Sequence, residues 1–122
     1  MALLNRESVL AATDTRTEVV SVPEWGGEVI VRGLSGTELE KFESSITSTK
    51  GKPVLDHVRA RLCQLAIVGE DGRPMFKPHD VVALGAKSAV ALNRVFDVAR
   101  RLSGMTKEEV EEIAKNSEET PG

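Results

Sequence analysis

Residues 17–36 read TEVVSVPEWGGEVIVRGLSG, and this stretch decides the first half of the fold. Its flanks, TEVVSV and EVIVR, are rich in β-branched residues, which suit pleated, half-buried strands. Between them, PEWGG supplies a proline that fixes φ and two glycines that can take the positive φ of a tight reversal. The stretch predicts a β-hairpin. Val20 and Val22 should share one face of the first strand, and Val29 and Val31 one face of the second.

Helical patterns follow the hairpin. We expect helices over residues 35–46, 53–68, 78–84, 87–102 and 106–116, and the stretch 1–14 permits one further short helix. Ser35 and Glu38 have the spacing of a capping box, and so do Thr106 and Glu109. Gly104 fits the glycine that ends a helix. The predicted fold class is α+β, with a small N-terminal β-hairpin packed on a bundle of about four to five α-helices.

The length of 122 residues fits one domain. We expect an N-terminal arm or short helix over residues 1–16, a single α+β domain over 17–116, and a disordered acidic tail over 117–122. The residues are 40% hydrophobic and 3% aromatic, so the core should consist of aliphatic side chains rather than stacked rings.

The net charge of -3 gives no long-range attraction to nucleic acid. Because Cys63 is the single cysteine, no internal disulfide is expected. The sequence shows neither a secretory signal nor an apolar run of the roughly 20 residues that span a bilayer. We therefore expect a cytosolic protein with no nucleic-acid and no membrane partner.

No catalytic or metal-binding constellation is evident in the sequence. His57 and His79 lack a second ligand at metal spacing. Cys63 lies among apolar helix positions and is interpreted as a small buried hydrophobe. Asp71-Gly72 is interpreted as a turn rather than a calcium loop. The protein is predicted not to be an enzyme and to need no cofactor.

Three apolar residues in turns are candidates for binding a partner. Trp25 lies in the hairpin turn, and Met75 and Phe76 lie in the predicted loop 69–76. Tryptophan is over-represented at binding hot spots, yet packing of Trp25 over its own strands is the favoured alternative. Met75 and Phe76 are likewise expected to pack back on the core, and all three could line a groove.

A basic cluster on the predicted helix 87–102 comprises Arg94, Arg100 and Arg101. Arg94 and Arg101 are candidate contacts to an acidic partner, although a solvated helix face with local ion pairs is the favoured interpretation. A small DNA-binding regulator that uses the cluster is a further, less favoured hypothesis.

Three segments together resemble the tail assembly chaperones of long-tailed, siphovirus-type bacteriophages. They are VPEWGGEVIVRGLSGTELEKFE at 22–43, EDGRPMF at 70–76 followed by Asp80, and KSAVALNRVFDVARRLSGMT at 87–106. The resemblance covers about residues 17–116 and rests on the combination and order of the segments.

The resemblance implies a chaperone that binds the tape measure protein and keeps it soluble until tail tube subunits polymerise around it. Such a protein acts in the host cytoplasm and is absent from the mature virion. The family also commonly makes a longer form by programmed ribosomal frameshifting, whose extension recruits the tail tube protein. A homo-oligomer is left open. The alternative function is a structural tail or head-tail joining subunit that stays in the particle.

Overall fold

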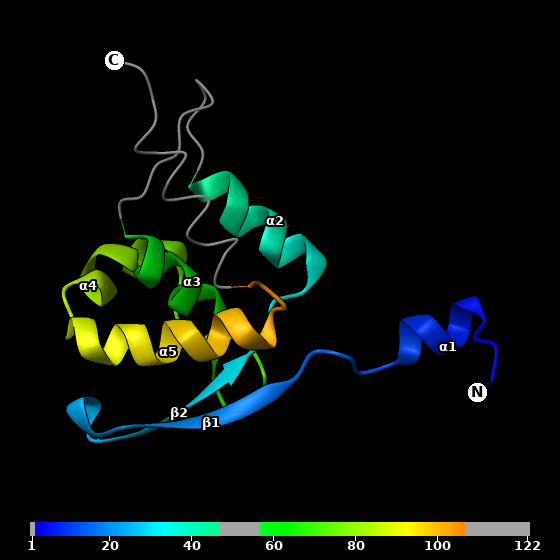
Figure 1. Cartoon of the computed structure of the whole chain (residues 1–122), viewed down its shortest axis with the longest axis horizontal. Helices are drawn as coiled ribbons and strands as arrows, with labels where there is room; N and C mark the ends of the chain where they lie inside the picture. The colour runs from blue at the N-terminus through cyan, green and yellow to red at the C-terminus, as the bar shows by residue number, and fades with distance from the viewer. Residues whose placement is uncertain (1, 47–56, 107–122) are drawn as a thin grey trace, which may run out of the picture.

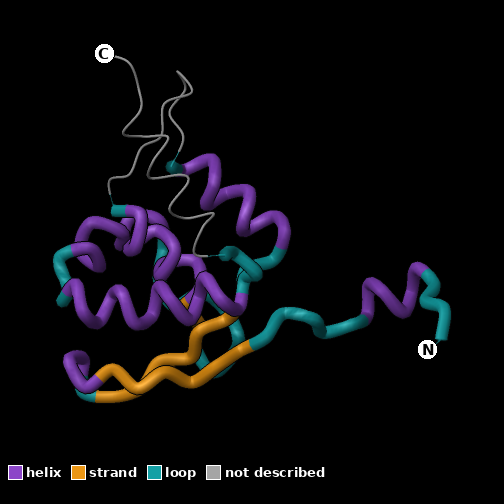
Figure 2. Tube along the Cα trace, viewed as in Figure 1, coloured by secondary structure: helices purple, strands orange, loops and turns teal. Residues whose placement is uncertain are grey.

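The computed structural model describes residues 2–46 and 57–106, and these form an α+β fold (Figure 1). The strands are β1 (Thr17–Val22), β2 (Gly27–Arg32) and β3 (Ile67–Val68), and the α-helices are α1 (Arg6–Ala11), α2 (Gly36–Ser45), α3 (Val58–Ala66), α4 (Val81–Gly85) and α5 (Ala89–Leu102). Two 3₁₀ turns, η1 (Pro23–Trp25) and η2 (Pro78–Asp80), complete the elements. Helices α3, α4 and α5 form a layer on one face of the hairpin (Figure 2). The predicted fold class is confirmed.

The predicted hairpin is present, with β1 antiparallel to β2 and Val20 opposite Val29. In the turn, Gly26 has a φ of 79°, and its amide donates to the Pro23 carbonyl at 3.0 Å. Val20 and Val22 are buried on the face that meets the helices, as the alternation predicts. Of the two glycines that the sequence offers for the reversal, Gly26 takes the positive φ and Gly27 begins β2.

Strand β3 was not predicted. The sequence indicates one helix over 53–68, but α3 ends at Ala66, and Ile67 and Val68 pair with β2. Both residues are β-branched and buried, so they suit a strand as well as a helix. The open edge of β2 offers them backbone partners, which decides the outcome. Residues 53–56 of the predicted helix lie outside the described residues.

Helix α2 begins at the predicted capping box. The amide of Ser35 donates to Glu38 Oε1 at 2.9 Å, and the amide of Glu38 donates to Ser35 Oγ at 3.3 Å. Glu38 also pairs with Arg32 at 2.6 Å. Burial alone raises the pKa of Glu38, but the hydrogen bonds from Ser35 and Arg32 outweigh it and hold the pKa below its usual value. Phe42 and Ile46 bury the inner stripe of this helix as predicted.

Helix α5 runs along the hairpin and packs against α3 (Figure 1). It begins after Ser88, whose hydroxyl accepts from the Ala91 amide, and ends before Gly104, whose φ is 78°. Leu92, Val95, Phe96 and Ala99 form its buried inner stripe. Ala89, the first residue of the helix, is exposed.

The ends of β2 and α5 meet at Gly33. A Cβ atom on Gly33 would lie 2.4 Å from the Leu102 carbonyl oxygen. The next amide, that of Leu34, donates to Ser103 Oγ at 2.9 Å. The hairpin and the helix therefore touch backbone to backbone at this point.

The short helix α1 lies apart from the other elements (Figure 1). It confirms the helix expected in residues 1–14, and no residue of it is buried. The predicted boundaries of the arm and the domain remain predictions. The helix predicted over 106–116 and the acidic tail 117–122 lie outside the described residues, apart from Thr106.

Candidate functional site

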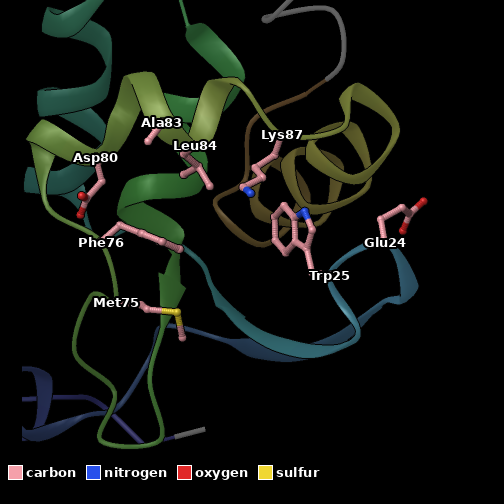
Figure 3. A pocket seen from close by; sticks show the side chains of 8 residues that line it. All are labelled: Glu24, Trp25, Met75, Phe76, Asp80, Ala83, Leu84 and Lys87. Atoms are coloured by element: carbon pink, nitrogen blue, oxygen red, sulfur yellow. The ribbon is translucent and has the colours of Figure 1, made fainter.

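An open hollow lies where the hairpin turn faces the loop after β3 and the helix α4 (Figure 3). Its volume is about 750 Å³, which is within the range of protein binding pockets. The lining residues are Glu24, Trp25, Met75, Phe76, Asp80, Ala83, Leu84 and Lys87. The structure thus brings together the three apolar residues that the sequence singled out, although residues 26–74 separate Trp25 from Met75 in the chain.

Backbone contacts in the loop after β3 position Met75 and Phe76. Gly72 has a φ of 79°, and Asp71 Oδ1 accepts from the Arg73 amide at 3.0 Å, as expected of an Asp-Gly turn. The Met75 amide donates a hydrogen bond to the Ile67 carbonyl in β3 at 3.0 Å. The Phe76 carbonyl accepts from the side chain of Gln64 at 3.1 Å. The turn therefore brings the loop back along β3 and holds it against α3.

The two loop residues differ in exposure. Phe76 is partly buried and packs against the core, as expected. Met75 is 52% exposed, so the expectation that it packs back on the core is wrong. The backbone of Met75 is bonded to β3 at the edge of the fold. Its side chain faces the hollow (Figure 3). A half-exposed methionine is an adaptable contact surface.

Trp25 packs on the protein's own core, the favoured interpretation, and its role in binding a partner stays a prediction. It packs against the core while lining the hollow. Its indole nitrogen is buried and has no hydrogen-bond partner among the described residues. Buried donors are nearly always paired, and an unpaired donor costs about 1–3 kcal/mol. The packing of Trp25 thus leaves its indole N–H without a partner among the described residues. Local violations of this kind are common at functional positions.

A bidentate ion pair fixes the turn that carries Trp25. The two terminal nitrogens of Arg94 donate to Glu24 at 2.7 and 3.0 Å. The hydrogen bond from Arg94, with a second one from the backbone, lowers the pKa of Glu24 to about 2. The same hydrogen bond raises the pKa of Arg94. Glu24 is therefore a carboxylate at neutral pH, and its charge is compensated within the chain.

Arg94 and Arg101 do not line the hollow. Arg101 donates to both carboxylate oxygens of Glu18 on β1 at 2.8 Å. Arg100 donates to the Met105 carbonyl at 3.0 Å. Each predicted basic contact is thus occupied inside the chain, and two of them join α5 to the hairpin. Their role in binding a partner stays a prediction.

Three charged residues of the hollow, Glu24, Asp80 and Lys87, were not predicted from the sequence. Asp80 lies at one side, where its carboxylate accepts from the Lys77 amide at 2.8 Å and lies 3.5 Å from His79. Lys87 lies between α4 and α5, and its side chain extends toward the indole of Trp25 (Figure 3). No local sequence pattern marks an exposed lysine such as Lys87 as part of a site. The sequence Pro78 to Asp80 indicates only the start of a helix.

Other kinds of site find little support. The described residues contain no group of three or more His, Cys, Asp or Glu side chains that could hold a metal. None of the helices within them is long and apolar enough to cross a membrane. Cys63 is buried, and burial raises the pKa of its thiol to about 12, so the prediction of a buried hydrophobe is confirmed.

Comparison with known proteins gives one line of evidence. No protein-family model matches the chain, and no curated protein matches it. A solved structure titled "Structure of bacteriophage HK97 tail assembly chaperone" is similar, with a TM-score of 0.56 and 21% sequence identity. The match covers 79% of this chain and 95% of that chain. The chain therefore has the fold of a phage tail assembly chaperone, in agreement with the resemblance found in the sequence.

Proposed function

We propose that this protein is a phage tail assembly chaperone that binds the tape measure protein and keeps it soluble until tail tube subunits polymerise around it. The proposal rests on the similarity of its fold to the HK97 tail assembly chaperone over most of both chains. In this function the protein acts in the host cytoplasm, has no catalytic role and is absent from the mature virion. A longer form made by frameshifting would bring in the tail tube protein.

The hollow suits a role in client binding. Trp25, Met75 and Phe76 place two aromatic rings and a flexible thioether around one open space. Aromatic side chains contribute most to the affinity of typical protein interfaces, and methionine adapts to varied partners. We infer that the client contacts the chaperone here.

Co-expression with the client tests the function. Under this proposal the client is the tape measure protein of the same phage, which would be expressed alone and together with this chain. We expect the client to be insoluble alone, and soluble and co-purifying when this chain is present. An insoluble client beside a well-folded chain would contradict the proposal. In that case, mass spectrometry of purified virions would identify a structural subunit by its stoichiometric presence.

Two variants test whether the client binds in the hollow. Trp25→Ser combined with Met75→Ser should abolish co-purification, while the fold should persist because Met75 is half-exposed and Trp25 only partly buried. Val19→Ser is the matched control, since Val19 is an exposed apolar residue on β1 outside the hollow. If the double variant and the control bind the client equally well, the hollow is not the binding site.

A further inference from the structure

The hollow contains a positive charge that no described residue compensates. Glu24 is neutralised by its bidentate pair with Arg94. The acidic side chain of Asp80 also lines the hollow, where it accepts a hydrogen bond from the Lys77 amide. The side chain of Lys87 makes no hydrogen bond or ion pair with any residue in the ranges 2–46 and 57–106. An occupant of the hollow would therefore meet one available cation.

The apolar part of the lining of the hollow is partly exposed. Trp25 and Phe76 pack against the core with one side and line the hollow with the other. Leu84 is 5% exposed and lies deeper, whereas Met75 is 52% exposed. Covering such apolar surface favours binding. An occupant that combines apolar side chains with an acidic group beside Lys87 would complement this part of the hollow.

The elements around the hollow favour a helical occupant. Its lining residues come from η1, the loop after β3, η2, α4 and the α4–α5 connection, and none belongs to a strand. A segment that adds to the fold as a β-strand would need a strand edge for its backbone hydrogen bonds. A helix satisfies its backbone internally and presents side chains on one face.

We propose that the hollow binds an amphipathic helix of a partner protein, with apolar side chains against Trp25, Met75 and Phe76 and a carboxylate paired with Lys87. This inference rests on the proposed function, because it names the chemistry of the client segment that the hollow would take. The hollow would then select among client helices by their charge as well as by their hydrophobicity.

The chain itself provides the reporter for a direct test. Trp25 is its only tryptophan, and the chain has no tyrosine, so the emission of the intact protein comes from the hollow. The probes are three amphipathic helical peptides of about 18 residues without tryptophan or tyrosine, a length at which an isolated helix can form. They share one leucine face and carry Glu, Gln or Lys at a single position beside it.

The Glu peptide should shift the emission of Trp25 and bind most tightly. Replacing its Glu by Gln should weaken binding about threefold, the usual effect of one solvent-exposed ion pair. In Lys87→Glu the order should reverse, so that the Lys peptide binds best. Lys41→Glu is the control, because Lys41 is exposed on α2, lies outside the hollow and changes the net charge equally.

Three results would overturn the inference. The first is equal binding of all three peptides whichever residue occupies position 87, and the second is an unchanged Trp25 emission with every peptide. The third is an emission that depends on the concentration of the protein alone, because a second copy would then fill the hollow. Co-purification of the client is measured separately, so the proposed function can survive each of these results.

Discussion

Gly33→Ala should destabilise the fold because two backbones approach too closely at this position for any side chain. A Cβ atom there would lie 2.4 Å from the Leu102 carbonyl oxygen and 2.8 Å from its carbon. Neither atom can rotate away, so β2 and α5 must separate. Separation would also strain the hydrogen bond between the Leu34 amide and Ser103.

The expected cost is about 2–3 kcal/mol, the upper part of the range for overpacked cores, since flexible side chains do not absorb the strain. For a domain of this size that corresponds to a fall in Tm of about 10 °C. Thermal unfolding followed by circular dichroism measures it. Gly36→Ala is the matched control, because a Cβ atom there meets nothing within 4 Å and alanine favours the first turn of α2.

If Gly33→Ala melts within about 2 °C of Gly36→Ala, the close approach does not hold in solution and the reasoning fails. A large fall for both variants would point instead to a requirement for glycine flexibility. Only a fall confined to Gly33→Ala supports a contact between the two backbones.

Three further predictions follow from the packing and charges. The Glu24–Arg94 pair should stabilise the fold above pH 4.5 and lose this contribution as the pH falls from 4.5 toward 2, because folding lowers the pKa of Glu24 from 4.5 to about 2. The urea midpoint of Glu24→Gln should therefore change less than that of the wild type over this range. Deletion of residues 2–12 should change Tm by less than about 2 °C, since α1 buries no residue. In the folded protein Cys63 should resist a thiol reagent at pH 8 and react only after denaturation, as judged by mass spectrometry, because its pKa is about 12.

The hairpin and α2 could be predicted because their signals are local. The turn Pro23 to Gly26 and the capping box at Ser35 involve residues within four positions of one another, and local chemistry determines both. Strand β3 could not be predicted. Ile67 and Val68 continue the apolar pattern of α3, and only the nearby edge of β2 makes them a strand.

Part of the hollow could also be predicted. Trp25, Met75 and Phe76 were chosen as large apolar residues in turns, which have no helix or strand face of their own to pack on. Sequence could not indicate that they meet, nor that Lys87 joins them. Helical periodicity placed Arg94 on the outer face of α5, but its partner Glu24 is 70 residues away in the chain.

The position of Trp25 therefore depends on α5 as much as on the turn itself. Arg101 holds β1 at Glu18, near its start, and Arg94 holds the turn at Glu24, just past its end. These two ion pairs, one near each end of β1, join the strand to α5. Val22, which lies between them in the chain, is buried in the core. A partner that bound Arg94 would have to break a bidentate pair and would release the turn that carries Trp25. Because that would dismantle the apolar hollow, the basic face of α5 is better explained as the support of the site than as the site itself.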